Sequence, residues 1–107
     1  RVTRIVDTFL EHARIWYFGN GGNPKLFLGS PDWMRRNLYR RIEAVTPILD
    51  PDAKQELIDM LSIQLSDKRK ACFVDENLHN CWKSVHPLKE KVRSQYTFYE
   101  YLKERIE

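Results

Sequence analysis

Hydrophobic residues recur along the chain at two spacings, which predicts a mixture of helices and strands. Five apolar residues near the start are three to four positions apart, as on one helix face: Val2, Ile5, Val6, Phe9 and Leu10. This spacing predicts an amphipathic helix over residues 2–11. A similar series of apolar positions predicts a final helix over residues 88–106.

Alternating and branched-rich runs predict the strands. Residues 13–18 and 25–29 are rich in aromatic and branched side chains, and the segment 19–24 between them reads Gly-Asn-Gly-Gly-Asn-Pro. This concentrated turn signal predicts a β-hairpin. A third strand is predicted over 40–46, where apolar and polar residues alternate, and a short one over 71–74.

A helix with a defined start is predicted from Pro51 to Ser66. Asp50 can cap its first turn, and Pro51 suits the first helical position. Residues 75–87 lack clear periodicity and are predicted to be loop with one helical turn. The pattern as a whole predicts the α/β class, with a small mixed sheet flanked by helices.

Composition narrows the class of protein. With 107 residues, 42% of them hydrophobic, the chain can build one core, so residues 1–107 are predicted to form a single domain. No apolar run approaches the ~20 residues of a transmembrane helix, and no signal-type stretch opens the chain. We expect a cytoplasmic location, with peripheral membrane association left open. Because the chain starts without methionine and directly in an apolar pattern, we expect a segment of a larger protein.

The cysteines and the charged residues bear on partners. Cys72 and Cys81 match neither a disulfide framework nor a zinc motif, so no metal site is expected within this chain. The net charge is only +3, but the basic residues are clustered at positions 35–41, 68–70 and 89–93. Such clusters suggest a polyanionic partner, whereas the plainer interpretation is a set of solvated faces.

Histidine is the side chain best suited to proton exchange or phosphoryl transfer near neutral pH. His12 lies at the predicted helix-to-strand junction, and Arg14 follows two positions later, on the same face if both belong to a strand. His79 and His86 lie in the unpatterned segment without such neighbours, and we interpret them as structural. His12 is therefore the candidate catalytic residue.

A turn and an arginine-rich stretch follow the second strand. Ser30 can offer a hydroxyl and a backbone N–H to a phosphate. Four arginines occur within seven residues, and the guanidinium group matches phosphate oxygens in pairs: Arg35, Arg36, Arg40 and Arg41. Alternatively, one or two of them form ion pairs with Asp32, Glu43 or Glu11. Trp33 and Tyr39 could stack on a base, although core packing is their commoner use.

These motifs together resemble one family. The segments that carry the resemblance, in order and in spacing, are 9–15 (Phe-Leu-Glu-His-Ala-Arg-Ile), 20–22 (Asn-Gly-Gly), 32–38 (Asp-Trp-Met-Arg-Arg-Asn-Leu) and 40–43 (Arg-Arg-Ile-Glu). They strongly resemble the last domain of the polyphosphate kinases, and the similarity continues through residues 50–51, 64–67 and 92–95. It covers nearly the whole chain.

The resemblance implies a reversible transfer of the ATP γ-phosphate to inorganic polyphosphate through a phosphohistidine, with Mg²⁺. It also implies a phospholipase D-like half-domain in a larger cytoplasmic transferase that forms homo-oligomers and does not bind nucleic acid. The phosphorylated histidine and the Mg²⁺ ligands would then lie in upstream domains, so this chain alone is expected to be inactive. His12 matches the second histidine of the site, beside the γ-phosphate.

The resemblance also assigns the phosphate-binding residues. Arg41 matches an arginine of the phosphate tunnel, and Arg36 is a weaker candidate. Arg14 and Ser30 belong to a relaxed version of the phospholipase D signature.

Two other functions remain open at this point. A phospholipase D-type phosphodiesterase is disfavoured because Arg14 stands at the signature lysine and Asp32 at the expected asparagine. A non-catalytic polyanion- or nucleic-acid-binding module would also explain the basic clusters, and it would share a steep salt dependence of binding with the kinase.

Overall fold

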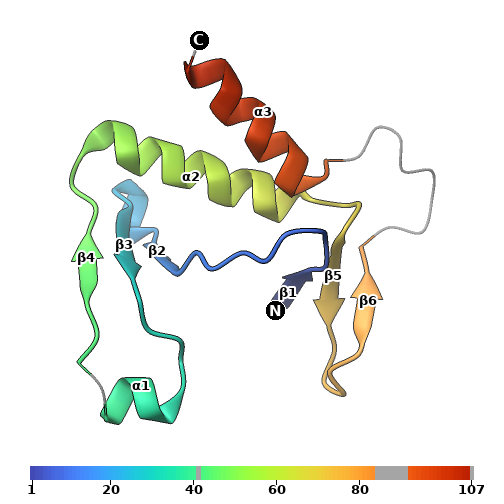
Figure 1. The fold of residues 1–107 in the computed structure, drawn as a ribbon, viewed down its shortest axis with the longest axis horizontal. Coiled ribbons are helices and arrows are strands. Elements are labelled where there is room, and N and C mark those ends of the chain that lie inside the picture. The colour runs from blue at the N-terminus through green and yellow to red at the C-terminus, as the bar shows by residue number, and fades with distance from the viewer. Residues whose placement is uncertain (41, 84–91, 107) are drawn as a thin grey trace. The chain divides into compact units, whose positions relative to one another are not determined.

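The computed structural model describes residues 1–40, 42–83 and 92–106. Its residues group into two compact units (Figure 1): Glu11–Glu56, and Arg1–Leu10 together with Leu57–Glu107. The α/β class is confirmed, but the strands form two three-stranded sheets, and every pairing between the described strands is antiparallel. The prediction of one domain over the whole chain stays a prediction.

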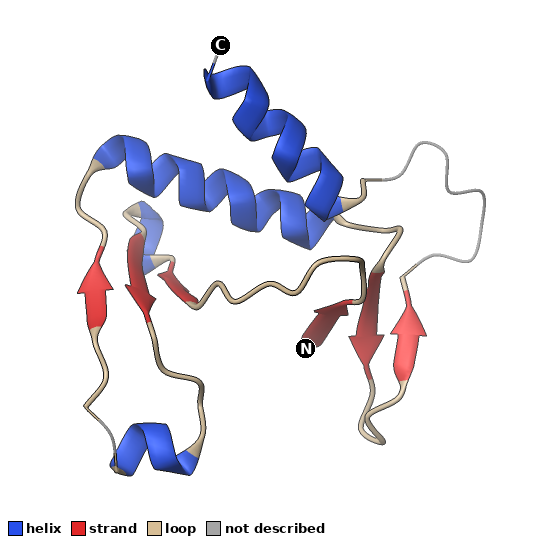
Figure 2. Cartoon of the chain, viewed as in Figure 1, coloured by secondary structure: helices blue, strands red, loops and turns tan. Residues whose placement is uncertain are grey.

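The unit Glu11–Glu56 holds the predicted hairpin. Its sheet has the order β2 (Ile15–Phe18), β3 (Lys25–Gly29) and β4 (Val45–Pro47), drawn as red arrows in Figure 2. Strands β2 and β3 pair from Ile15 opposite Leu28 to Phe18 opposite Lys25, which confirms the hairpin. Leu26, only 2% exposed, is its most buried hydrophobic side chain.

The connection between β2 and β3 needs glycine. The backbone passes through a short 3-10 turn, η1 (Asn20–Gly22), with φ values of 46° at Asn20, 63° at Gly21 and 93° at Gly22. Positive φ is strained for most side chains and free of cost for glycine. The turn signal in the sequence therefore reports a true backbone requirement.

The third strand begins later than predicted. Helix α1 (Arg35–Tyr39) precedes it, Arg40 follows the last turn of this helix, and Arg41 lies outside the described residues. The strand β4 covers only the residues that find backbone partners on β3, from Val45 opposite Gly29 to Pro47 opposite Phe27. Alternation predicted a strand here, but the register on β3 decides how much of the segment becomes one.

The second sheet has the order β1 (Val2–Ile5), β5 (Ala71–Val74) and β6 (Asn80–Trp82). The predicted strand over 71–74 is confirmed and forms the centre of this sheet. Cys72 on β5 is fully buried, where a free thiol packs as a small apolar side chain.

The helix predicted over residues 2–11 is wrong, since this segment contains strand β1 followed by irregular chain that bends at 7–9. Arg4 pairs with Cys72 of β5, and Val6 N donates to Lys70 O at 2.9 Å, so the backbone groups are satisfied by the sheet. Beyond it, Phe9 exchanges two hydrogen bonds with the Gln95 amide, at 2.9 and 2.7 Å. These long-range bonds replace the helical ones.

The other elements are partly as predicted. Helix α2 (Pro51–Ser66) is confirmed, and the Asp50 carboxylate accepts the Ala53 backbone N–H at 2.8 Å, as expected of a cap. Helix α3 (Ser94–Ile106) is shorter than predicted, and 88–91 lie outside the described residues. The prediction of a loop over 75–87 is wrong for the residues of β6, which pair with β5. Residues 84–87 lie outside the described residues.

One buried carboxylate joins three parts of the unit that contains β1, β5 and β6. Asp67, at the end of α2, is completely buried, and its Oδ1 accepts N–H groups of Arg69, Lys70 and Ala71 at 2.8–3.1 Å. Its Oδ2 accepts the N–H of Ser94 at 2.7 Å, at the start of α3. Burial raises the pKa of this carboxyl, but the backbone donors outweigh burial and hold the pKa below its usual value.

Candidate functional site

Three side chains of the unit Glu11–Glu56 lower the pKa of the Asp32 carboxyl: Arg14, His12 and Arg36. We call them, together with Asp32, the Asp32 cluster. Arg14 Nε donates to Asp32 Oδ1 at 2.7 Å. This hydrogen bond is the main cause of a lowered Asp32 pKa; partial burial opposes it, and the charges of Arg14, His12 and Arg36 add to it. Of the predicted site residues, Arg14 therefore contacts this carboxylate directly, whereas His12 and Arg36 act on it through charge alone.

The backbone positions both partners of the ion pair. Arg14 precedes β2 directly, and its carbonyl accepts the Gly29 N–H at 3.2 Å, which continues the hairpin ladder by one step. The Asp32 carbonyl accepts the Met34 N–H at 2.8 Å and the Asn37 side-chain amide at 3.2 Å. Asn37 is buried on α1, and its hydrogen bond holds Asp32 close to that helix.

Glycine is required at the end of β3 beside the cluster. A Cβ atom on Gly29 would lie 2.7 Å from the Trp16 ring and 3.0 Å from a Val45 methyl group. The ring thus covers the strand end from which the 30–32 turn leaves. A cleft of about 240 Å³ opens there, lined by residues 13–16 and 31–33. It is smaller than the ~300–1,000 Å³ of drug-sized ligand sites, so it suits one phosphoryl group better than a whole nucleotide.

Ser30 is engaged in a different contact. Its hydroxyl donates to Glu43 Oε2 at 2.6 Å, and its backbone N–H donates to Ala44 O at 3.2 Å. Both donors that could serve a phosphate are thus used by the residues just before β4. A phosphate-binding role for Ser30 stays a prediction, and it would require the Glu43 carboxylate to move.

The other predicted site residues and the remaining histidines lie in different parts of the chain. His12 lies in irregular chain before β2, not at a helix end, because the first helix does not form. Arg41 lies outside the described residues, as does His86. His79 faces Asp75, with Nδ1 3.6 Å from Oδ2, in the other unit.

Sequence reasoning missed the part played by Asp32. It placed Asp32 among possible partners of the arginines at 35–41, whereas the structure pairs it with Arg14. The hairpin held the signal: with Ile15 opposite Leu28, residue 14 must lie opposite Gly29, close to the 30–32 turn. Register, not local pattern, identifies this ion pair.

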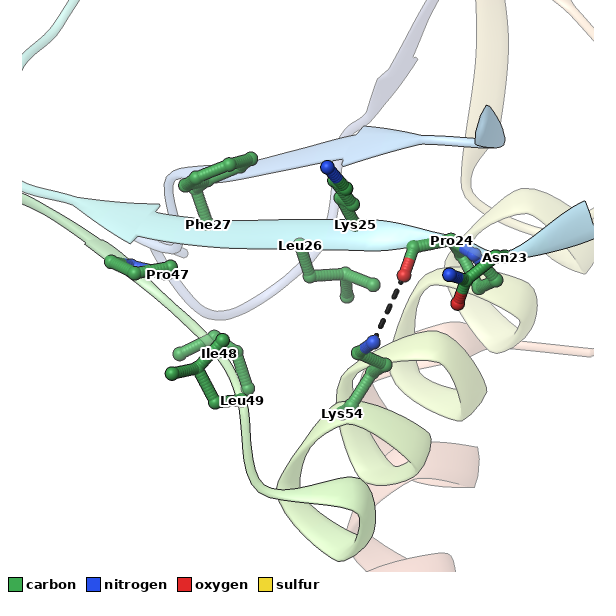
Figure 3. Close-up of a pocket in the computed structure, with 9 residues that line it drawn as sticks. All are labelled: Asn23, Pro24, Lys25, Leu26, Phe27, Pro47, Ile48, Leu49 and Lys54. Atoms are coloured by element: carbon green, nitrogen blue, oxygen red, sulfur yellow. Dashed lines mark hydrogen bonds between the residues drawn. The ribbon is translucent and has the colours of Figure 1, made fainter. Parts of the chain in front are cut away.

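A second pocket in the same unit differs in chemistry. It measures about 280 Å³ and is lined mainly by apolar residues of β3 and the segment 47–49 (Figure 3). Lys54 extends toward β3 there, and its ammonium group donates to Pro24 O at 3.0 Å. Since this cation serves the loop before β3, the pocket is a poorer anion site than the Asp32 cluster.

The described residues do not fit a metal site. Among them, no group of three or more His, Cys, Asp or Glu side chains is arranged to hold an ion. The one carboxylate of the Asp32 cluster is already paired with Arg14. None of the helices in the described part of the chain has both the length and the apolar character needed to span a membrane.

Comparison with known proteins gives concordant results. The family model for the polyphosphate kinase C-terminal domain 2 matches residues 1–95. Polyphosphate kinase of Escherichia coli K12 is 45% identical over 103 residues, which are 96% of this chain and 15% of that protein. That of Vibrio vulnificus is 42% identical over 102 residues, 95% of this chain and 14% of the relative.

A solved structure agrees in fold. The crystal structure of polyphosphate kinase from Porphyromonas gingivalis superimposes with a TM-score of 0.91 at 51% sequence identity. The superposition covers 98% of this chain and 16% of that protein. The chain therefore spans about a sixth of the length of these proteins.

Proposed function

The chain belongs to the polyphosphate kinase family, and we propose that it supplies part of the phosphate site of a larger phosphotransferase. The proposed reaction is the reversible transfer of the ATP γ-phosphate to inorganic polyphosphate. The Arg14–Asp32 ion pair at the cleft beside β3, with the charges of His12 and Arg36 also acting on Asp32, is the observation that carries the proposal. Arg14 and Asp32 both line the cleft of about 240 Å³, whose size suits a phosphoryl group.

The geometry suits phosphoryl transfer, which needs positioning and charge neutralisation more than covalent chemistry from the protein. The Asp32 hydrogen bond uses Nε of Arg14. Among the described residues, no hydrogen-bond partner engages its two Nη atoms, which leaves four N–H donors for phosphate oxygens. Asp32 holds the guanidinium plane in place, so less rotamer entropy is lost when phosphate binds.

His12 acts on the transferred group as a proton donor or as an imidazolium beside the γ-phosphate. In this proposal the phosphorylated histidine and the Mg²⁺ ligands belong to upstream domains, as the family resemblance implies. The isolated chain is accordingly expected to be inactive. The complete enzyme is expected to be a cytoplasmic homo-oligomer that uses ATP, ADP and polyphosphate.

Replacement of His12 tests the proposal. In the complete enzyme, His12→Ala should lower kcat for ATP-driven polyphosphate synthesis about 100-fold, because one well-aimed donor in a transition state contributes roughly 10²–10³. His79→Ala is the matched control: it removes the same side chain from the other unit, and it should leave kcat within about twofold. Enzyme-coupled ADP release and polyphosphate gels measure both variants.

The outcome can contradict the proposal clearly. A His12→Ala rate within about threefold of wild type, under ~0.7 kcal/mol of barrier, would remove His12 from the site. Hydrolysis of a phosphodiester substrate by wild type, lost in His12→Ala, would instead indicate phospholipase D-type chemistry.

A further inference from the structure

Helix α1 also carries a second cationic surface, formed by side chains other than that of Arg36. Arg35, Leu38, Tyr39 and Arg40 line an open cleft of about 610 Å³, which we call the α1 cleft. None of these residues belongs to the Asp32 cluster. Tyr39 is 80% exposed and Leu38 52% exposed, so the helix presents both hydrocarbon and charge to this cleft.

Within the described part of the chain, the two guanidiniums of the α1 cleft have no compensating anion. The lining residues include no acidic side chain, and among the described residues no hydrogen bond or ion pair engages the side chain of Arg35 or Arg40. By contrast, Arg14 and Arg93 are each held by a carboxylate. Two like charges in one concave surface repel each other until an anion binds, and apolar walls increase the potential between them.

We propose that the α1 cleft docks the non-reacting phosphates of a linear polyphosphate chain; this inference rests on the function proposed above. The position supports it: Asn37 on the same helix donates to the Asp32 carbonyl at 3.2 Å, so the cleft lies on the helix that holds Asp32. A five-residue helix is about 7.5 Å long at ~1.5 Å per residue, a span that several linked phosphates can follow. Guanidinium forks match their paired oxygens.

The lining favours polyphosphate over single-stranded nucleic acid. Nucleic-acid channels combine cations with several aromatic platforms for successive bases. Among the described residues, the lining of the α1 cleft offers one ring, that of Tyr39, beside two cations. Polyphosphate carries a charge on every repeat and has no bases, so it matches a lining of two cations and one ring.

The test is a double substitution in the complete enzyme, Arg35→Gln with Arg40→Gln. The matched control, Lys25→Gln with Lys103→Gln, removes two exposed charges elsewhere, so that net charge changes equally. Kinetics are measured in the ATP-forming direction with ADP and either long-chain polyphosphate or tripolyphosphate. By this inference, the long chain fills the Asp32 cluster and the α1 cleft together, whereas tripolyphosphate occupies the Asp32 cluster alone.

We expect the KM for long-chain polyphosphate to rise about tenfold in the arginine variant. Its kcat, its KM for ADP and its KM for tripolyphosphate should stay within about twofold, as should all constants of the lysine control. The slope of log KM against log salt should also fall by about two, one for each guanidinium that no longer neutralises a phosphate.

Three results would overturn the inference. They are an unchanged KM for the long chain, an equal rise for tripolyphosphate, and an equal rise in the lysine control. Loss of binding to a fluorescent single-stranded RNA, with polyphosphate kinetics unchanged, would assign the cleft to nucleic acid. If the arginine variant behaves as wild type while His12→Ala is inactive, the docking site fails and the proposed function stands.

Discussion

Replacement of Asp67 by asparagine should destabilise the chain strongly, although the two side chains have almost the same shape. The Asp67 carboxylate is fully buried and accepts four backbone N–H groups. In Asp67→Asn, one oxygen can still accept three of them, but the amide NH₂ then faces the N–H of Ser94. Two donors face each other, and the remaining bonds lose their charge assistance.

The magnitude follows from these contacts. An unsatisfied buried N–H costs about 1–3 kcal/mol, and each hydrogen bond that loses its charged acceptor weakens by roughly 0.5–1 kcal/mol. With three such weakened bonds, the sum is about 2.5–6 kcal/mol, a large share of the ~5–15 kcal/mol that stabilises an ordinary domain. Urea unfolding at pH 7, followed by circular dichroism, measures the difference. Asp52→Asn, on the exposed first turn of α2, should cost under ~1 kcal/mol.

The pH dependence of this difference is the sharper test. The pKa of Asp67 is lowered in the folded state, so its stabilisation is complete above the unfolded pKa of about 4 and is lost as pH falls further. The gap between wild type and Asp67→Asn should therefore be constant above pH ~5 and narrow below pH ~4. A gap under ~1 kcal/mol at pH 7, or one that does not change with pH, would refute the reasoning.

Two further predictions concern the strand end beside the site and the acid stability of the chain. Gly29→Ala would place a methyl group 2.7 Å from the Trp16 ring, so we expect a loss of about 1–3 kcal/mol by urea unfolding and lower activity of the complete enzyme; unchanged stability would contradict this close packing. Arg93 hydrogen-bonds to Asp7 and lowers the Asp7 pKa from 3.8 to about 2, against the opposing effect of burial. The ion pair therefore stabilises the folded chain above pH ~4, and this stabilisation is lost as pH falls through about 2. Because solvent around Arg93 weakens the interaction, the stabilisation amounts to roughly 1–2 kcal/mol. Urea titrations from pH 5 to pH 2 should show this loss of stability in wild type but not in Arg93→Met.

The first strand shows how local pattern can mislead. The apolar positions from Val2 to Leu10 fit a helix, yet four of the first six residues are β-branched: Val2, Thr3, Ile5 and Val6. Such side chains favour extended backbone, and pairing with β5, nearly seventy residues away, decides the outcome. Distant backbone partners can be read only from the folded chain.

The candidate site shows the same division. His12, Arg14 and Arg36 could be named from residue chemistry and from a family resemblance, because imidazole and guanidinium suit phosphate whatever the fold. The pairing of Arg14 with Asp32 depends on hairpin register, and the position of Asp32 on its contact with Asn37; neither has a local signature. The Glu43 contact that occupies the Ser30 hydroxyl could not be foreseen for the same reason.

The sequence by itself determined what depends on near neighbours. The glycine turn between β2 and β3 and the capped start of α2 follow from backbone preferences within a few residues. Tertiary structure alone decided the fate of residues 2–11, the extent of β4 and the burial of Asp67, because each depends on hydrogen bonds to segments distant in the chain. Residues suited to phosphate can be recognised from the local sequence, whereas the contacts that orient them depend on the long-range pairing of the fold.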